Sequence, residues 1–523
     1  MSIRMRPHRH FAKADPTHET TAVPIKAAAA KAAACALAVM LAAALFGCMV
    51  GPDYKRPGTP MPESFKEAPP GWKVAEPADH ADRGPWWTIY NDARLDGLMG
   101  KLNGANQTVA QFAAVYRQAR ALVAEARAAY FPTIGLTASA TRSGQQLSSS
   151  SSFSTFGGST SRITNSFNLA LDATWEPDLW GKVSRTVSAQ RAGQEGAAAD
   201  LANARLSAQA TLAQSYFQLR ELDAMQRLLD DTVTAYTQAL QLTKNQYAQG
   251  VAARSDVIQA QTQLQSAQAA AIDNGVARAQ DEHAIAVLVG EPASTFSIPP
   301  IPLDVEPPQV PLEVPSALLE RRPDIASAER KAAAANEEIG VVMSAYFPLL
   351  TLSAQGGYQS SIFSQLLTLP SRFWTIGPSL AETVFDAGLR HAQTQAARAA
   401  YDQQVAFYRQ TVLAAFQDVE DNLASQRILA REIVVQRQAV DSARQALAIV
   451  TNEYKAGTVG YVNVLTAQTT AFAAEQRLAI LSGLRMVSSV GLVKALGGGW
   501  DVGQIARETG AGQAPARAPL ARE

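Results

Sequence analysis

The sequence predicts a mainly α-helical protein, built from two copies of one half, with strands that contribute to a membrane β-barrel. Three observations predict this class: two stretches of more than 100 residues without proline, short segments that alternate with period two, and motifs that recur about 210 residues apart. The 46 Lys and Arg balance the 46 Asp and Glu. This balance argues against a nucleic-acid-binding protein, which usually carries a basic excess. Two cysteines exclude a disulfide scaffold.

The N-terminus is predicted to be an export signal. Basic residues within 1–31 precede an uncharged run, 32–46, which is too short to span a bilayer but suits a signal-peptide core. The run ends in Leu45-Phe46-Gly47-Cys48, which is typical of a bacterial lipobox. We expect Cys48 to become the lipidated N-terminus, because several acyl chains anchor a protein stably. The alternative is a plain signal peptide that happens to contain a cysteine. No later stretch is expected to be long and apolar enough for a membrane helix, so strands are expected to cross the membrane.

An internal repeat organises the rest of the chain. Ala129-Tyr130-Phe131-Pro132 returns as Ala345-Tyr346-Phe347-Pro348, and Tyr247-Ala248-Gln249-Gly250 returns as Tyr454-Lys455-Ala456-Gly457. We therefore divide the chain into a lipoprotein signal (1–47), a lipidated extended segment (48–84), a first repeat (85–291), a linker with nine prolines that cannot form a helix (292–323), a second repeat (324–500) and a disordered tail (501–523).

Long coiled-coil helices are expected inside each repeat. Apolar residues between Leu212 and Leu240 recur with a mean spacing of 3.5, which is the coiled-coil signature. The pattern predicts one helix over about 183–246 and a returning helix over about 255–288. A single helix over 95–129 is expected to stack end to end with the returning helix, beside the long one. The second repeat is expected to start corresponding helices near Asp324, Leu389 and Tyr461.

Four strands of nine or ten residues are expected beyond the other ends of the long helices. Their apolar, alternating positions are Ile134, Leu136, Ala138 and Ala140; Phe167, Leu169, Leu171, Ala173 and Trp175; Leu350, Leu352 and Ala354; and Trp374, Ile376 and Leu380. Pro378 weakens the last strand. Four strands cannot close a barrel, and hydrocarbon does not tolerate open sheet edges, so the chain must associate. Two copies would give eight strands and three would give twelve. The alternative is a soluble helical protein with two small β-hairpins.

Three motifs occur in a characteristic order: Cys48-Met49-Val50-Gly51-Pro52-Asp53-Tyr54-Lys55-Arg56-Pro57, Arg321-Arg322-Pro323-Asp324-Ile325, and Lys494-Ala495-Leu496-Gly497-Gly498-Gly499-Trp500. With the repeats, they resemble the TolC-like outer-membrane channels of tripartite efflux pumps, of the lipoprotein type that serves RND transporters. The resemblance covers about 48–500. It implies a homotrimer anchored in outer-membrane lipid, whose twelve strands form one barrel and whose helices form a periplasmic tunnel.

The same resemblance implies a periplasmic adaptor and an inner-membrane RND-type transporter as partners. The chain would be a passive exit duct for small toxic compounds or drugs; the alternative is the channel of a type I protein secretion system. It would be no enzyme and would need no cofactor. The sequence agrees, since it has no P-loop, GxSxG or HExxH motif. The histidines expected in the mature chain, His80, His283 and His391, are too far apart in sequence to suggest a metal site.

The resemblance places the gate and the adaptor contact at the turns between long and returning helices. The gate candidates are Asp256, Tyr454, Asn463 and Thr466, and the adaptor-docking candidates are Gly250, Val251, Ala252, Gly457, Thr458 and Val459. A threefold ring of Asp256 would attract cations, although Asp256 or Ser255 could equally cap the returning helix. Tyr454 matches a family tyrosine that holds the closed state, with ordinary packing as the alternative.

Two further expectations concern these turns. Asn463 and Thr466 stand where relatives often carry aspartate, so the tip is expected to be less acidic than in many relatives. Gly250 and Gly457 are expected to end their helices in the left-handed conformation.

Overall fold

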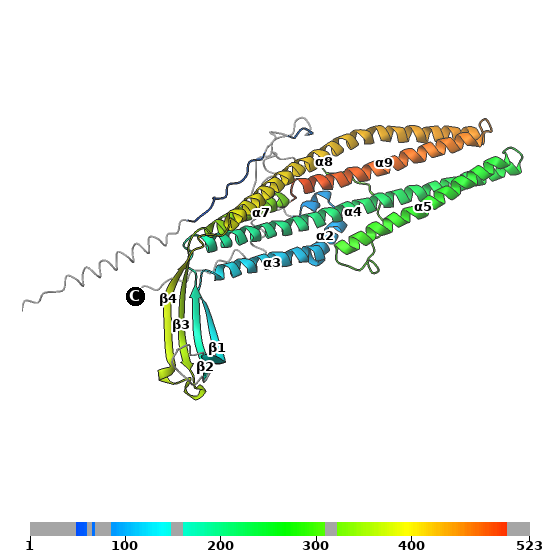
Figure 1. Ribbon diagram of the computed structural model, residues 1–523. Helices are drawn as coiled ribbons and strands as arrows, with labels where there is room; N and C mark the ends of the chain where they lie inside the picture. The colour runs from blue at the N-terminus through cyan, green and yellow to red at the C-terminus, as the bar shows by residue number, and fades with distance from the viewer. Residues whose placement is uncertain (1–48, 60–64, 68–84, 148–159, 309–321, 499–523) are drawn as a thin grey trace, which may run out of the picture.

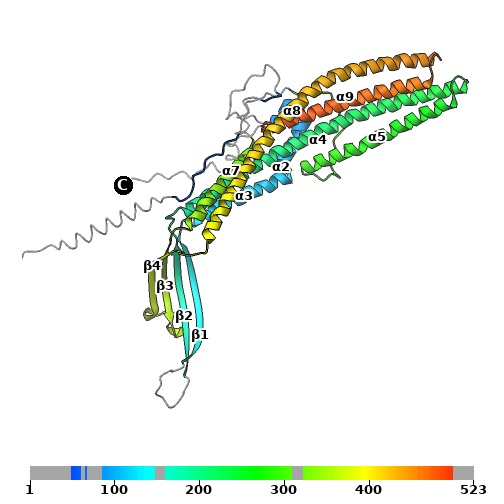
Figure 2. The same cartoon turned by 45° about the horizontal axis from the view of Figure 1, so that its top comes forward.

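The structure, a computed structural model, describes residues 49–59, 65–67, 85–147, 160–308 and 322–498 (Figure 1). A long arm of helices continues at one end into a four-stranded sheet, and the two helical turns lie together at the other end (Figures 1 and 2). The elements are η1 (Trp86–Tyr90), α2 (Ala93–Ala105), α3 (Gln107–Ala128), β1 (Thr133–Leu147), β2 (Thr160–Trp175), α4 (Lys182–Ala248), α5 (Arg254–Leu288), α7 (Pro323–Ser344), β3 (Leu349–Ser360), η2 (Phe363–Gln365), η3 (Leu369–Ser371), β4 (Arg372–Ala381), α8 (Leu389–Lys455) and α9 (Tyr461–Ala495).

The duplication is visible in the lengths of the helices. The long helices α4 and α8 each have 67 residues, and the returning helices α5 and α9 each have 35. Both long helices begin directly after a glycine with positive φ, Gly181 at 78° and Gly388 at 89°. At 1.5 Å per residue, each long helix extends about 100 Å. The predicted long and returning helices are thus confirmed in both halves.

The predicted single helix over 95–129 is wrong, because the chain breaks at Asn106 between α2 and α3. The backbone of Asn106 is extended, and its Oδ1 accepts a hydrogen bond from the Val109 N–H at 2.9 Å, so it caps α3. Its Nδ2 donates to the Leu288 carbonyl at 2.7 Å, at the end of α5. Asn106 therefore links the start of α3 to the end of α5. Helices α3 and α5 lie end to end beside α4, as predicted (Figure 1).

The linker also ends differently from the prediction. Helix α7 starts at Pro323, whereas the sequence predicts that Pro323 belongs to the non-helical linker. Proline is tolerated at the first helical position, where its missing N–H has no partner to lose. Residues 292–308 form no helix, in agreement with their prolines.

The four strands form one antiparallel sheet in the order β1-β2-β3-β4, so β1 and β4 are its edges. The register pairs Leu136 with Leu171, Leu171 with Gly356, and Gly356 with Trp374. Since residues two apart point to the same face, all four predicted apolar stripes lie on one face of the sheet. Pro378 pairs with Leu352 on edge strand β4, where a missing N–H is tolerated.

The strand lengths correct the prediction in the first half. β1 has 15 residues and β2 has 16, against the nine or ten expected, while β3 has 12 and β4 has 10. The extra length lies in polar residues beyond Ala140, such as Ser143, whose hydroxyl forms a hydrogen bond at 2.9 Å with that of Thr164. These residues lack an apolar alternation, so the pattern ended before the strand did.

The repeated Tyr-Phe-Pro motif connects the helical arm to the sheet. It directly follows α3 and α7 and directly precedes β1 and β3. The second copy of the motif contacts Trp180. The Trp180 ring stacks on the Phe347 ring with their centroids 4.9 Å apart, and its Nε1–H donates to the Pro348 carbonyl at 2.8 Å. In the first copy, the Tyr130 carbonyl accepts from Trp175 Nε1–H at 3.1 Å. Aromatic side chains therefore gather where helices give way to strands.

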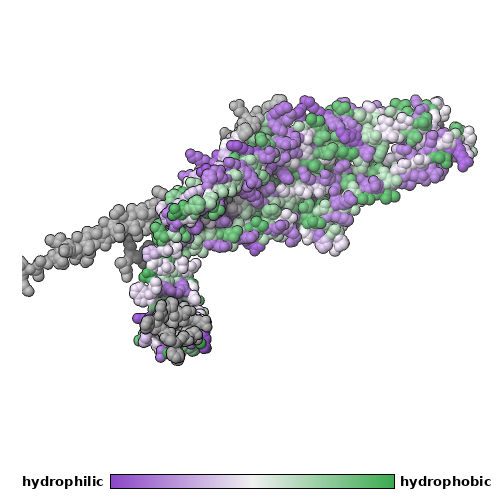
Figure 3. Space-filling model, viewed as in Figure 1, coloured by the Kyte–Doolittle hydropathy of each residue, from purple (hydrophilic) through white to green (hydrophobic). Residues whose placement is uncertain are grey.

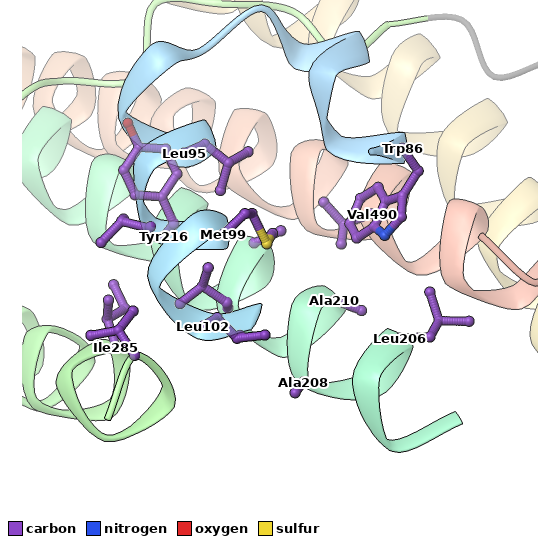
Figure 4. Packing of buried hydrophobic residues seen from close by; sticks show 14 of the residues in the cluster. Trp86, Leu95, Met99, Leu102, Leu206, Ala208, Ala210, Tyr216, Ile285 and Val490 are labelled. Carbon is purple, nitrogen blue, oxygen red and sulfur yellow. The ribbon is translucent and has the colours of Figure 1, made fainter. Parts of the chain in front are cut away.

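The main hydrophobic core lies halfway along the helical arm. Leu95, Met99 and Leu102 of α2 are directed towards α4 and α5, where Tyr216 and Ile285 are fully or almost fully buried (Figure 4). At one side of this core, Asp92 caps α2 and also accepts hydrogen bonds from the Tyr216 hydroxyl and Arg220 Nη1, both at 2.8 Å. This core ties the α2–α3 pair to the long helix.

Helix α9 corrects another expectation. Contrary to the sequence analysis, it is long and apolar enough to cross a membrane by length and composition. It packs instead along α8 and α4, and Leu481, Met486 and Val490 are fully buried there. Burial in the helical arm accounts for part of the apolar character of α9, since 44% of its apolar window is buried.

The first described residues, 49–53, are held by contacts at the junction between the helical arm and the sheet. The Val50 N–H donates to the Trp180 carbonyl at 3.2 Å. Arg185, 2% exposed at its side chain, contacts Asp53 at 3.2 Å and Glu337 at 2.9 Å. Gly51 has a φ of 105°, and a Cβ there would lie 2.6 Å from the Gly340 Cα. Residues 49–53 are therefore held between α4 and α7; Cys48, the signal and the tail lie outside the described residues.

Candidate functional site

The predicted site residues gather at the end of the helical arm away from the sheet. The α4–α5 turn and the α8–α9 turn lie side by side there (Figures 1 and 2). A small hydrophobic cluster joins them and is made of Leu240, Ala260, Tyr454, Tyr461 and Val464. We call this group the tip cluster. Because its members come from α4, α5, α8 and α9, the two turns share one packing unit.

The two turns have the same backbone geometry. Gly250 and Gly457 have φ values of 76° and 77°, which confirms the left-handed conformation predicted for both. After each glycine the N–H returns to the helix: Val251 N donates to the Gln246 carbonyl at 2.9 Å, and Thr458 N donates to the Glu453 carbonyl at 3.1 Å. Glycine suits both positions because it adopts positive φ without a Cβ penalty.

Asp256 is the third residue of helix α5. Its Oδ2 accepts a hydrogen bond from the Ala253 N–H at 3.3 Å, and its Oδ1 lies 3.4 Å from the donating Ser255 hydroxyl. The carboxylate thus satisfies a donor that precedes the first helical turn, where negative charge is favourable. This is the geometry of the capping alternative, with Asp256 rather than Ser255 as the acceptor. Asp256 is half-buried, so part of it also faces solvent.

Tyr454 holds the second turn onto the first half of the chain. Its ring is buried in the tip cluster and lies 5.6 Å from the Tyr461 ring. Its hydroxyl donates to Thr243 Oγ1 on α4 at 3.3 Å, and its carbonyl accepts from Gln246 Nε2 at 3.5 Å. Burial raises the pKa of Tyr454, with a smaller contribution from the Asp256 charge. Tyr454 is therefore both a packing residue and a link between the two halves.

The other two gate candidates behave differently. Asn463 and Thr466 are exposed on the first two turns of α9. The Thr466 hydroxyl donates to the Val462 carbonyl one turn earlier at 2.9 Å. Neither residue belongs to the tip cluster. The structure thus buries Tyr454 in the tip cluster, while Asn463 and Thr466 lie on an exposed surface.

The docking candidates divide in the same way. Gly250, Val251, Gly457 and Thr458 are exposed, and Val251 is exposed over 65% of its surface. Ala252 is half-buried, and Val459 packs against the tip cluster. Val251 therefore presents apolar surface at the end of the helical arm.

Sequence analysis missed two residues of this site. Thr243 Oγ1 accepts the hydrogen bond from the Tyr454 hydroxyl, and the ring of Tyr461, at the start of α9, packs against the Tyr454 ring in a tilted arrangement. Burial, followed by the neighbouring Tyr454, Tyr236 and Asp256, raises the pKa of Tyr461 to about 12. The position of Thr243 on the face of α4 that meets the second half cannot be read from a helical pattern. Tyr461 did offer a signal, as an aromatic residue directly after the Gly460 that caps α9.

Comparisons with known proteins agree on the family. The model of the family described as outer membrane efflux protein matches residues 98–291 and 314–498. The pyoverdine export outer membrane protein OpmQ of Pseudomonas aeruginosa is 31% identical over 449 residues, which are 85% of this chain and 94% of that protein. The cation efflux system protein CusC of Escherichia coli is 27% identical over 462 residues, 88% of this chain and 98% of that protein.

Solved structures show the same fold. The outer-membrane channel OprN superimposes with a TM-score of 0.79 and 27% identity, covering 87% of this chain and all of that one. The open state of the Neisseria gonorrhoeae MtrE outer membrane channel gives a TM-score of 0.74 and 27% identity, covering 86% and 98%. The family model matches both halves of the chain, and these two structures cover most of it. The chain therefore belongs to the outer membrane efflux protein family.

Proposed function

We propose that the chain is the outer-membrane channel of a tripartite efflux pump and acts as a passive exit duct for small toxic compounds. The observation that carries this proposal is the register of the sheet. It gathers the apolar side chains of all four strands on one face, where Ile134, Leu136, Trp374 and Ile376 are each at least 70% exposed. A sheet with one exposed apolar face suits contact with lipid on that face and with water on the other.

The edges of the sheet support a homotrimer. β1 and β4 are edge strands, and backbone groups at an open edge cannot be left unpaired in hydrocarbon. In the assembly that we propose, β4 of one copy pairs with β1 of the next, and three copies give one twelve-stranded barrel. The helical arms of the three copies then enclose a tunnel that extends into the periplasm.

The helical arm offers surface for this association. Figure 3 shows apolar and polar residues interspersed along the visible side of the arm. On α8, exposed apolar residues extend along most of the helix: Phe407, Leu413, Ile428, Val434, Val435 and Ile449. An exposed apolar strip of this length suits burial against another helix of the same kind. In our proposal, the neighbouring copy covers it.

The relatives support efflux over protein secretion. They are named for the export of pyoverdine, for toluene or solvent efflux and for cation efflux. These cargoes differ widely in chemistry, whereas the chains are about 30% identical to this one over most of their length. This supports a duct whose cargo is selected by another component, which we infer to be an inner-membrane RND-type transporter joined through a periplasmic adaptor.

We place the adaptor contact at the two turns, Gly250 to Ala252 and Gly457 to Val459, through their exposed residues Gly250, Val251, Gly457 and Thr458. Val251 would supply the central apolar contact because of its exposure. We place the gate at Asp256 and Tyr454, with Asn463 and Thr466 on the surface that faces the neighbouring copies. The link from Tyr454 to Thr243 supports this gate, because it ties the second turn to helix α4.

Lipidation of Cys48 remains part of the proposal. Two and three residues after Cys48, Val50 and Gly51 contact Trp180 and Gly340, where the helical arm meets the sheet. A lipid on Cys48 would thus lie near the inner surface of the outer membrane. Incorporation of labelled palmitate should disappear in Cys48→Ser; palmitate that stays bound to this variant would contradict the assignment.

Two measurements test the channel and its partners. In planar bilayers, the purified protein should form pores, whereas a non-channel scaffold should form none. In cells, a bifunctional thiol reagent on Ala253→Cys, exposed at the first turn, should capture an adaptor encoded with an RND pump. Ala128→Cys, exposed at the opposite end of the arm, is the matched control and should not capture it. Capture of an adaptor of an ABC secretion system would move the function to protein export.

A further inference from the structure

Within residues 133–141, 166–175, 349–360 and 372–381, the polar face of the sheet carries one charged side chain; further along β2, the register puts position 162, an arginine, on the same face. Over 133–141, 166–175, 349–360 and 372–381, which are all described, the face opposite the apolar stripes holds glycine, alanine, serine, threonine, asparagine, glutamine, leucine, phenylalanine and Asp172. Asp172 pairs with Gly135 of β1 and with Gln355 of β3. A carboxylate among neutral residues is unusual in a strand, because strands are depleted in aspartate.

The carboxylate of Asp172 is held in place by two neutral donors. Thr137 Oγ1 donates to its Oδ2 at 2.5 Å, and Gln355 Nε2 donates to its Oδ1 at 2.6 Å. Gly135, directly opposite on β1, has no side chain that could cover the carboxylate. Because a hydroxyl and an amide carry no net charge, this arrangement fixes the direction of Asp172 and leaves its negative charge uncompensated by either partner.

The position of Asp172 along the sheet is also defined. Its partner Gly135 is the third residue of β1, so Asp172 lies about 7 Å along the strand from the helical end of the sheet. The helical turns with Asp256 are at the other end of the arm, about 100 Å away along the long helices. Asp172 and Asp256 are therefore separate sites.

We propose that Asp172 determines charge selectivity inside the barrel: three copies form a fixed ring of carboxylates in the lumen that favours cations over anions. The inference rests on the proposed function, since the polar face lines a lumen only in a closed barrel. Rings of carboxylates line cation-selective pores in general. Thr137 and Gln355 act as positioning residues that keep the carboxylates directed into the lumen. Small cations, including cationic organic compounds, are the class of permeant that this ring favours.

The test is reversal potential across planar bilayers under a potassium chloride gradient. Asp172→Asn keeps the shape of the side chain and removes its charge. We expect the permeability ratio of potassium to chloride to fall at least about twofold at 0.01 M salt, and less at 1 M salt, where the screening length drops from about 30 Å to about 3 Å. Asp172→Glu should retain the selectivity of the wild type. Asp256→Asn is measured in parallel, so that the contribution of the tip is known.

Thiol chemistry provides an independent measurement if Asp172→Asn fails to form pores. Asp172→Cys should react with a water-soluble cationic thiol reagent in the bilayer, and the reaction should lower the potassium preference. An anionic reagent should raise it. Leu171→Cys is the matched control: it is the next residue in the strand but lies on the apolar face, and it should not react.

The outcomes separate the inference from the proposed function. Pores of Asp172→Asn with wild-type selectivity at low salt, or an unreactive Asp172→Cys in conducting pores, would overturn the ring while leaving the channel intact. Absence of pores from the wild-type protein would overturn the proposed function itself. If the reagent modifies Leu171→Cys but not Asp172→Cys, the assignment of the two faces is inverted and the inference is overturned.

Discussion

The two helical turns share a backbone but differ in how they are held. Each follows a 67-residue helix and precedes a 35-residue one, and each turns at a glycine with nearly the same φ. The tyrosines at equivalent positions nevertheless differ: Tyr247 in the first turn is 48% exposed, while Tyr454 in the second is 5% exposed and bonds to α4. Duplication therefore preserved the path of the chain, while single side chains made the second turn depend on the first.

Removing the tyrosine ring should produce the largest difference between the turns. Tyr454→Ala leaves a cavity in the tip cluster and should lower the free energy of opening of the second turn by about 3 kcal/mol. Tyr247→Ala removes an exposed ring and should change the first turn by less than about 0.5 kcal/mol. Hydrogen exchange of the backbone amides in both turns measures these values. Equal effects of the two substitutions would contradict the asymmetry.

Alkaline pH should weaken the second turn through Tyr461. Its pKa is raised to about 12 in the folded protein, mainly by burial, against 10.0 for the ordinary side chain. Because the folded pKa is raised, the stabilising contribution of the neutral phenol is complete below pH 10 and is lost as the pH rises through 12. Difference absorbance of tyrosinate between the wild type and Tyr461→Phe should show one group with a midpoint near pH 12. A midpoint near pH 10 would mean that Tyr461 is not buried as described.

Substitution of the turn glycines should affect both turns alike and so sharpen the comparison. Gly250→Ala and Gly457→Ala each place a Cβ on a residue with positive φ, which should cost about 1 kcal/mol. No neighbouring atom lies within 4 Å of the added Cβ at either site, so the cost should come from the backbone alone. Thermal unfolding and hydrogen exchange should give equal losses within error. A clearly larger loss at one turn would show that the backbones are not equivalent.

The acidic cap should produce the smallest effect. Asp256 and Asn463 are both the third residue of their returning helices. Asp256→Asn should destabilise the start of α5 by about 0.5 kcal/mol, because it removes a negative charge from a helix N-terminus. Asn463→Asp should stabilise the start of α9 by a similar amount. Exchange rates in the first turn of each helix report both changes, and an unaffected Asp256→Asn would rule out a capping role.

Sequence patterns predicted the parts of this structure that repeat over many residues. The long helices followed from the spacing between Leu212 and Leu240, and the apolar face of the sheet followed from alternating residues such as Leu171 and Trp374. The break at Asn106 was missed because it depends on one amide that bonds to Leu288, far away in the chain. The ends of β1 and β2 were missed because polar pairing, as between Ser143 and Thr164, leaves no apolar pattern.

The candidate site was predicted in position but not in its contacts. Local motifs located both turns and both glycines, because turn geometry is encoded by adjacent residues. The bond between Tyr454 and Thr243 joins residues 211 positions apart and depends on how the two halves pack. The same holds for Arg185, whose contacts with Asp53 and Glu337 arise only when three segments meet. Contacts between the two halves therefore cannot be predicted from the sequence pattern of one repeat.

The length of α4 and α8 has a mechanical consequence. A rigid rod of about 100 Å that pivots at its base by about 3° moves its far end by about 5 Å. Both rods begin directly after a glycine with positive φ, Gly181 and Gly388, at the end next to the sheet. A small rotation at these pivots is therefore amplified into a displacement comparable with the length of the Tyr454 side chain. Conversely, contacts at the tip act about 100 Å from the pivot, so a few weak interactions there are enough to restrain rotation of the whole helix.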